Sequence, residues 1–180
     1  MDEAGINRLR CERQIRAAQG LAVQPRQRTR REAFLDKLPR VGAKKIAAET
    51  RKTHFAEIYH GLEACDAEYE SERCLYCAQK AWCNWTCPLH NHIPDFIRLV
   101  NKGNVIEAAE LCHQSSSLPE ICGRVCPQDR LCEGACTLKN EGGSVTIGNL
   151  ERYITDSALA MGWRPSVGHV VPRKERVAVI

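Results

Sequence analysis

Eleven cysteines are present in the 180-residue chain, and eight of them fall in two short runs. The first run has the spacing C-x2-C-x5-C-x3-C and the second C-x3-C-x5-C-x3-C, and each contains a cysteine directly followed by proline. Four closely spaced thiolates are the ligand set of structural zinc sites and of iron-sulfur clusters. The two runs consist of Cys74, Cys77, Cys83 and Cys87, and of Cys122, Cys126, Cys132 and Cys136.

The spacing favours iron-sulfur clusters over zinc. Structural zinc sites usually combine two CxxC-like pairs about a dozen or more residues apart. The first run instead follows the bacterial two-cluster ferredoxin pattern, in which a fourth, proline-marked cysteine ligates the other cluster, although its x5 interval departs from the x2 of that pattern. By this reasoning Cys87 and Cys126 share a second cluster, and Cys136 completes the first. Zinc remains the alternative.

Composition restricts the setting of this chemistry. The sequence contains no run of about 18 apolar residues and no apolar segment near its start, so we expect neither a membrane span nor a secretory signal. A cytoplasmic location follows, where cysteines serve metal or redox chemistry more often than disulfides. The isolated Cys11, Cys65 and Cys112 are predicted to be free thiols.

Positive charge is concentrated at the N-terminus. Residues 1–50 contain twelve Lys or Arg and six Asp or Glu, whereas the rest of the chain contains fourteen and sixteen. No aromatic residues alternate with these arginines and no nucleic-acid motif follows, so nucleic acid is not an expected partner. We predict a basic, partly disordered arm over residues 1–51 that is solvated or docks on a partner.

Helical patterns dominate residues 52–165, which predicts a mainly α domain with two cysteine-rich loops. Apolar residues recur at helical spacing, and Pro94, Gly103, the Asn104/Glu107 pair and Gly162 mark helix ends. Glu151 borders the apolar face of the last helix, where a carboxylate costs free energy unless it is paired or solvated. The predicted helices cover residues 55–73, 94–103, 104–111, a short segment from 118, and 146–161.

The final residues, VPRKERVAVI, change character. Their Val-Ala-Val-Ile ending is typical of a buried parallel strand, which has no partner strand in this sequence. We therefore interpret residues 166–180 as a linker and the first strand of a further domain of a longer protein.

Several segments closely resemble the N-terminal domain of the glutamate synthase small (beta) chain family, which is related to the N-terminal domain of dihydropyrimidine dehydrogenase. The resemblance covers about residues 46–180 and rests on RCLYC, CNWTCPLHNHIP, LPEICGRVCPQDRLCEGAC, SVTIGNLERYI and MGWRP. It implies an α-helical ferredoxin-like domain that carries two 4Fe-4S clusters and precedes an FAD- and NADPH-binding domain. The glycine-rich dinucleotide loop of that next domain is absent here, so FAD and NADPH would bind only in a downstream domain.

The resemblance also implies how the ligands are shared. Glu151 stands where dihydropyrimidine dehydrogenase places a glutamine ligand, while Cys122 is the alternative eighth ligand from spacing alone, and a glutamate that merely reaches solvent is a third possibility. The implied sets are Cys74, Cys77, Cys83 and Cys136 for the first cluster, and Cys87, Cys126, Cys132 and Glu151 for the second.

The expected function is electron transfer between a downstream flavin domain and a larger oxidoreductase subunit, with no catalysis by this segment alone. A cysteine-rich zinc module for protein assembly is the alternative. Near the ligands, His90 and His92 are expected to be ordinary loop residues. We expect Arg124 and Arg130 to raise a cluster potential through their charge, and Trp82 and Trp85 to shield a cluster from water.

Overall fold

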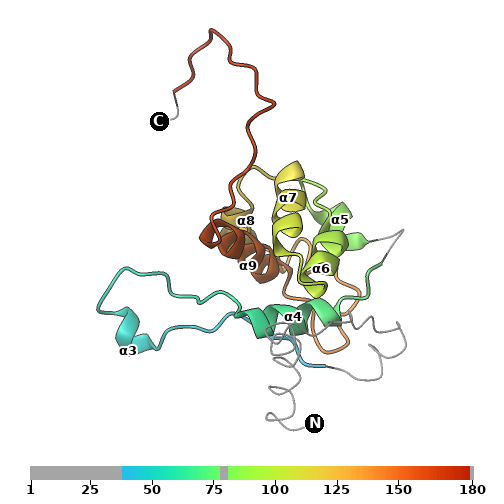
Figure 1. Ribbon diagram of the computed structural model, residues 1–180. Coiled ribbons are helices and arrows are strands. Elements are labelled where there is room, and N and C mark those ends of the chain that lie inside the picture. Colours follow the sequence, from blue (N-terminus) through green and yellow to red (C-terminus); the bar gives the residue numbers. More distant parts are fainter. Residues whose placement is uncertain (1–37, 78–80, 179–180) are drawn as a thin grey trace, which may run out of the picture.

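The computed structural model describes residues 38–77 and 81–178, and this part of the chain is helical with no named strand. The mainly α prediction is confirmed. Figure 1 shows helices α4 to α9 gathered into one body, with α3 at the end of a projecting loop. The helices are α3 (Ala48–Arg51), α4 (Ala64–Arg73), α5 (Trp82–Thr86), α6 (Ile93–Asn101), α7 (Val105–Ser115), α8 (Pro119–Val125) and α9 (Ile147–Ala160).

Helix α9 is the centre of this body and packs against α4, α6, α7 and α8. Its apolar residues recur at the 3.6-residue period, so one face is buried along its whole length. Leu150, Ile154 and Ala158 are fully buried and meet Phe96 of α6 in the core. The helix ends, as predicted, before Gly162, whose φ of 88° is accessible mainly to glycine.

The other predicted helix boundaries near the cysteines are also confirmed. Pro94 lies in the first turn of α6, where its missing N–H is not needed. Gly103, with a φ of 82°, separates α6 from α7, and Asn104 occupies the N-cap of α7. No side-chain hydrogen bond accompanies that cap, so the predicted Asn104/Glu107 pairing is wrong in detail.

The prediction of a helix over residues 55–62 is wrong. This segment instead runs antiparallel to residues 44–46, with hydrogen bonds from the Ile46 N–H to the Ile58 carbonyl and from the His60 N–H to the Lys44 carbonyl. Phe55 is fully exposed, and only Leu62 at the end of the segment enters the core. Helical spacing of four apolar residues therefore did not reflect one buried face.

At both ends of the chain, part of the predicted structure lies outside the described residues. Most of the predicted N-terminal arm lies outside the described residues, although Leu38 and Val41 are buried in the core. Residues 164–178 form no helix or strand, and Val177 is exposed; the predicted strand lies partly outside the described residues and stays a prediction. Of the isolated cysteines, Cys112 is a buried free thiol, Cys65 is disulfide-bonded, which contradicts its prediction, and Cys11 lies outside the described residues.

Candidate metal centre

The first thiol group joins both cysteine runs around one pocket. Cys74 caps the C-terminal end of α4, Cys83 lies in α5, and the other two thiols come from the loops that follow α4 and α8. Apolar side chains, among them Ile97 of the core, complete the wall. The thiols that line the pocket are Cys74, Cys77, Cys83 and Cys136, the same four that the sequence assigned to one cluster.

These four thiols are electrostatically coupled. Burial raises the pKa of Cys74, and the negative charges of Cys83, Cys136 and Cys77 raise it further. Burial and Cys136 raise the pKa of Cys83 to about 12. Four thiolates at this place would repel one another in a poorly hydrated pocket. A cationic metal group that compensates these charges fits this donor set.

Hydrogen-bonding groups contact two sulfur atoms of the first group, those of Cys74 and Cys77. The backbone N–H of Tyr76 lies 3.5 Å from Cys74 Sγ, and Tyr76 has a φ of 47°, an uncommon conformation for a non-glycine residue. Cys77 Sγ lies 3.8 Å from Thr137 Oγ1, which connects the first run to the second. Hydrogen bonds to ligand sulfur raise the reduction potential of a bound iron-sulfur cluster because they stabilise the more negative state.

A second donor group lies between α5, α8 and α9. Burial, together with the charges of Cys122, Glu151 and Cys87, raises the pKa of Cys126 to about 11. Burial also raises the pKa of Cys132, with additional effects of Glu133, Cys87 and Glu151. Cys87, Cys126, Cys132 and Glu151 therefore share one electrostatic environment with Cys122, and the choice of ligands among them stays a prediction.

Helix α5 contributes to both groups although it is only five residues long. Cys83 faces the first pocket, while Cys87, at the C-cap, interacts with the second group. The Cys87 N–H donates to the Cys83 carbonyl at 3.2 Å. The structure thus separates the last cysteine of the first run from the other three.

Glu151 is 9% exposed and lies on α9. Burial raises its pKa to about 7; the hydrogen bond from Asn91 lowers the pKa, and the charge of Glu120 raises it. The possibility that Glu151 merely extends into solvent does not agree with this burial. Cys122 also adjoins the second group, next to Cys126, and lies 3.7 Å from Ser116 Oγ. The geometry brings both candidate eighth ligands to the same place.

Gly123 of α8 allows the close approach of α8 to α9. A Cβ atom at Gly123 would lie 2.7 Å from the Gly148 carbonyl oxygen and 2.9 Å from the Arg152 nitrogen, closer than real Cβ contacts allow. Gly123 directly follows Cys122, and Gly148 lies one turn before Glu151. The close approach of the two backbones therefore brings these candidate ligands together.

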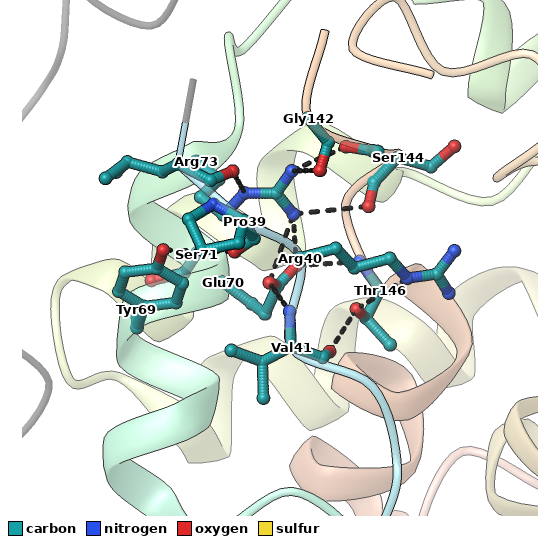
Figure 2. Close-up of polar contacts among 12 residues, drawn as sticks. Pro39, Arg40, Val41, Tyr69, Glu70, Ser71, Arg73, Gly142, Ser144 and Thr146 are labelled. Atoms are coloured by element: carbon teal, nitrogen blue, oxygen red, sulfur yellow. Dashed lines mark hydrogen bonds and ion pairs between the residues drawn. The ribbon is translucent and has the colours of Figure 1, made fainter. Parts of the chain in front are cut away.

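A buried ion pair lies directly before the first ligand. Arg73 and Glu70 of α4 are 2.9 Å apart, and the Arg73 guanidinium also donates to the carbonyls of Leu38, Gly142, Gly143 and Ser144. The Glu70 carboxylate accepts the backbone N–H groups of Val41 and Thr146. Figure 2 shows this network joining α4 to two distant segments. The positive charge of Arg73 also favours the thiolate of Cys136.

The remaining predicted neighbours play smaller parts. Arg124 pairs with Glu57 and Asp156 at 2.9 and 2.7 Å, so carboxylates already balance its charge. His92 is the N-cap of α6, and Arg130 is exposed. Trp82 lines the first pocket but is 59% exposed, and Trp85 is 69% exposed, so neither seals a site from water.

Three features of the site have no clear signal in the sequence: Asn91, the network of Glu70 and Arg73, and the close approach at Gly123. Asn91 is almost fully buried and donates to Glu151. Its position inside the motif around Cys87 was the only available signal, because asparagine is common in exposed loops.

Comparison with known proteins identifies the family. Residues 51–163 match the family model described as dihydropyrimidine dehydrogenase domain II, 4Fe-4S cluster. The chain belongs to this family. All members of the two donor groups lie within the matched residues, so the iron-sulfur interpretation of the cysteine spacing agrees with the family.

Curated relatives of this 4Fe-4S domain are much longer. "Putative oxidoreductase UacF" of Escherichia coli (strain K12) is 66% identical over 180 residues, which are 100% of this chain and 28% of the relative. Glutamate synthase (NADPH) small chain of the same strain is 52% identical over 147 residues, 82% of this chain and 31% of the relative. The NAD-dependent dihydropyrimidine dehydrogenase subunit PreT is 37% identical over 87 residues, 48% of this chain and 21% of the relative, also in that strain. The chain spans less than a third of these relatives.

The described helices include none that is both long and apolar enough to cross a membrane.

Proposed function

We propose that this 4Fe-4S domain binds two clusters and relays electrons between an FAD- and NAD(P)H-binding domain and a partner subunit or domain of a glutamate synthase small-chain-like oxidoreductase. The observation that carries the proposal is the exchange of ligands between the runs. Two donor groups form, and each draws on both runs. A pair of independent four-cysteine sites would have grouped each run with itself.

The donor arrangement favours clusters over the zinc alternative. Structural zinc sites usually combine two CxxC-like pairs. Neither proposed donor group consists of two such pairs, because Cys74 and Cys77 form the single CxxC pair of the sequence.

When bound, a 4Fe-4S cluster supplies a site that accepts and releases one electron. The first site is formed by Cys74, Cys77, Cys83 and Cys136, and the second by Cys87, Cys126, Cys132 and Glu151. The chain holds the cysteines in two half-buried groups, directs the Tyr76 N–H at Cys74 Sγ and supplies Cys83 and Cys87 from α5.

The relay partners are proposed from the relatives. The name of the glutamate synthase small chain includes NADPH, and that protein continues well beyond the part that this chain matches. The family resemblance adds FAD to the expected downstream domain. We propose that electrons enter from that domain and leave to a larger subunit, and that this segment alone makes and breaks no substrate bonds.

Metal analysis of the anaerobically purified chain tests the proposal. We expect about eight iron atoms per chain, matching acid-labile sulfide, and broad absorbance near about 400 nm that dithionite bleaches. A colourless protein that contains zinc and no iron would overturn it in favour of the assembly module.

The eighth ligand requires a separate comparison. Glu151→Gln should change the EPR spectrum and midpoint potential of the second cluster, whereas Cys122→Ser should leave both as in the parent. Cys112→Ser is the matched control, since Cys112 is a buried free thiol of the core. An unchanged second cluster in Glu151→Gln, together with its loss in Cys122→Ser, would assign the position to Cys122.

A further inference from the structure

Asn91 is a buried side chain that touches three parts of the fold at once. It is 3% exposed and lies in the loop between Cys87 and α6. Its Nδ2 donates to Glu151 Oε1 of α9 at 2.8 Å. Its Oδ1 accepts the His92 N–H at 3.0 Å and the hydroxyl of Ser115, the last residue of α7, at 2.9 Å.

The orientation of this amide follows from its partners. The backbone N–H of His92 can only donate, so the oxygen of the Asn91 amide must face it. The NH2 group then faces Glu151, whose carboxylate accepts. Ser115 lies on the oxygen side and reinforces the same orientation.

The hydrogen bond leaves part of the carboxylate available. In the described part of the chain, the Asn91 amide is the single hydrogen-bond partner of the Glu151 carboxylate. Oε1 is therefore engaged, while Oε2 has no hydrogen bond there. The thiols of Cys126 and Cys132 are close enough to respond to the charge of Glu151.

We propose that Asn91, held by Ser115, is a positioning residue for the second cluster, which fixes Glu151 so that one carboxylate oxygen is available to iron. The inference rests on the proposed function, specifically on Glu151 as a ligand. Asn91 lies four residues after Cys87, so the same contact also fixes the loop of that ligand relative to α9. Ligands oriented by an outer hydrogen bond are a general feature of metal sites.

A donor–acceptor exchange tests this role. Asn91→Asp keeps the acceptor for His92 and Ser115 but opposes a second carboxylate to Glu151. We expect iron to fall from about eight to about four atoms per chain, with loss of the second EPR signal and retention of the first. The double variant Asn91→Asp/Glu151→Gln restores the hydrogen bond with donor and acceptor exchanged, and should restore the second cluster.

Asn101→Asp is the matched control, because Asn101 of α6 is an equally buried asparagine whose amide donates to the Ser71 hydroxyl of α4. Asn101→Asp should lower thermal stability about as much as Asn91→Asp does, but it should leave the EPR signal of the second cluster unchanged. Ser115→Ala is a milder second variant that removes the hydroxyl holding Asn91; it should shift the midpoint potential of the second cluster only, and Ser115→Thr should reverse the shift.

The possible failures are distinguishable. Two normal clusters in Asn91→Asp, or a folded double variant that still lacks the second cluster, would overturn the positioning role. An unchanged potential in Ser115→Ala would also contradict it. If Glu151→Gln alone leaves the second cluster unchanged and Cys122→Ser removes it, the ligand assignment of the proposed function fails instead.

Discussion

Glu151 is a carboxylate whose burial favours its protonated form in the absence of a bound cation. Its pKa is raised from 4.5 to about 7, so the folded chain binds this proton more tightly than the unfolded chain. The stabilising contribution is complete below pH 4.5 and is lost as the pH rises through about 7.

A pH series on cluster-free protein tests this linkage. We expect the free energy of unfolding to fall by up to roughly 3 kcal/mol between pH 4.5 and 8 through this group. We expect the free energy of unfolding, measured in urea, to depend on pH differently in the parent and in Glu151→Gln between pH 4.5 and 8, because glutamine does not titrate. Parallel curves would contradict the raised pKa.

Arg73 is predicted to be the most costly polar side chain to truncate. Arg73→Ala leaves Glu70 buried without its ion pair, which typically costs about 3–5 kcal/mol. Denaturant unfolding measures the loss. Lys52→Ala is the control, because Lys52 forms an i,i+3 pair with Glu49 at the exposed surface and should cost less than about 1 kcal/mol. An equal loss of unfolding free energy in Arg73→Ala and Lys52→Ala would show that the buried network stabilises the fold no more than an exposed ion pair does.

At the scale of elements, the contact of α8 with α9 is predicted to control the second site. Gly123→Ala should improve helix propensity by about 1 kcal/mol, yet the added Cβ meets backbone atoms and must separate the helices. We expect a net loss of stability and loss of the second cluster, measured by unfolding and iron content.

Gly42→Ala is the control for that prediction, since a Cβ at Gly42 meets no atom within 4 Å. It should leave stability and iron content close to the parent. A stabilised Gly123→Ala variant with full iron content would contradict the importance of the close approach.

The whole molecule depends on contacts that connect distant segments. Glu57 binds Arg124 of α8 and Arg152 of α9, and Arg152 also donates to the Tyr59 carbonyl. These contacts hold the projecting loop of Figure 1 against the two helices. The Glu57 side chain is 47% exposed in both ion pairs, and solvent-exposed ion pairs contribute modestly, about 0.2–1 kcal/mol each.

Removing Glu57 should therefore loosen the loop without affecting the metal groups. Glu57→Gln is expected to accelerate chymotryptic cleavage after the exposed Phe55 by about 5-fold or somewhat more, with iron content unchanged. Glu49→Gln in the same loop is the control. Unchanged cleavage in Glu57→Gln would contradict the anchoring role.

The sequence predicted the helices best where the periodicity of apolar residues agreed with proline and glycine residues that mark helix ends. Pro94, Gly103 and Gly162 marked boundaries that the structure confirms, and the apolar face of α9 is the core. Residues 55–62 have helical spacing without a helix, because their backbone bonds to residues 44–46 instead. Such pairing between segments has no local signature.

The sequence could predict which cysteines belong to the candidate site. It could not predict the side chains that hold Glu151 in place. Spacing and family resemblance predicted which thiols lie together. The first four line one pocket, and the assignment of ligands to clusters stays a prediction. The support of Glu151 by Asn91 and Ser115 required knowledge of three elements that meet only in the folded chain. The choice between Glu151 and Cys122 stays a prediction, because the close contact of α8 and α9 brings both residues to the second group.

The glycines at that contact have a consequence for recognising related domains. A sequence could retain every cysteine of both runs and still be unable to form the second site in this geometry, if a larger residue replaced Gly123. Searches for function usually look for reactive side chains, whereas here the absence of a side chain defines how closely the donors approach. A small residue at 123 is thus a steric signature of the site that complements its chemical one.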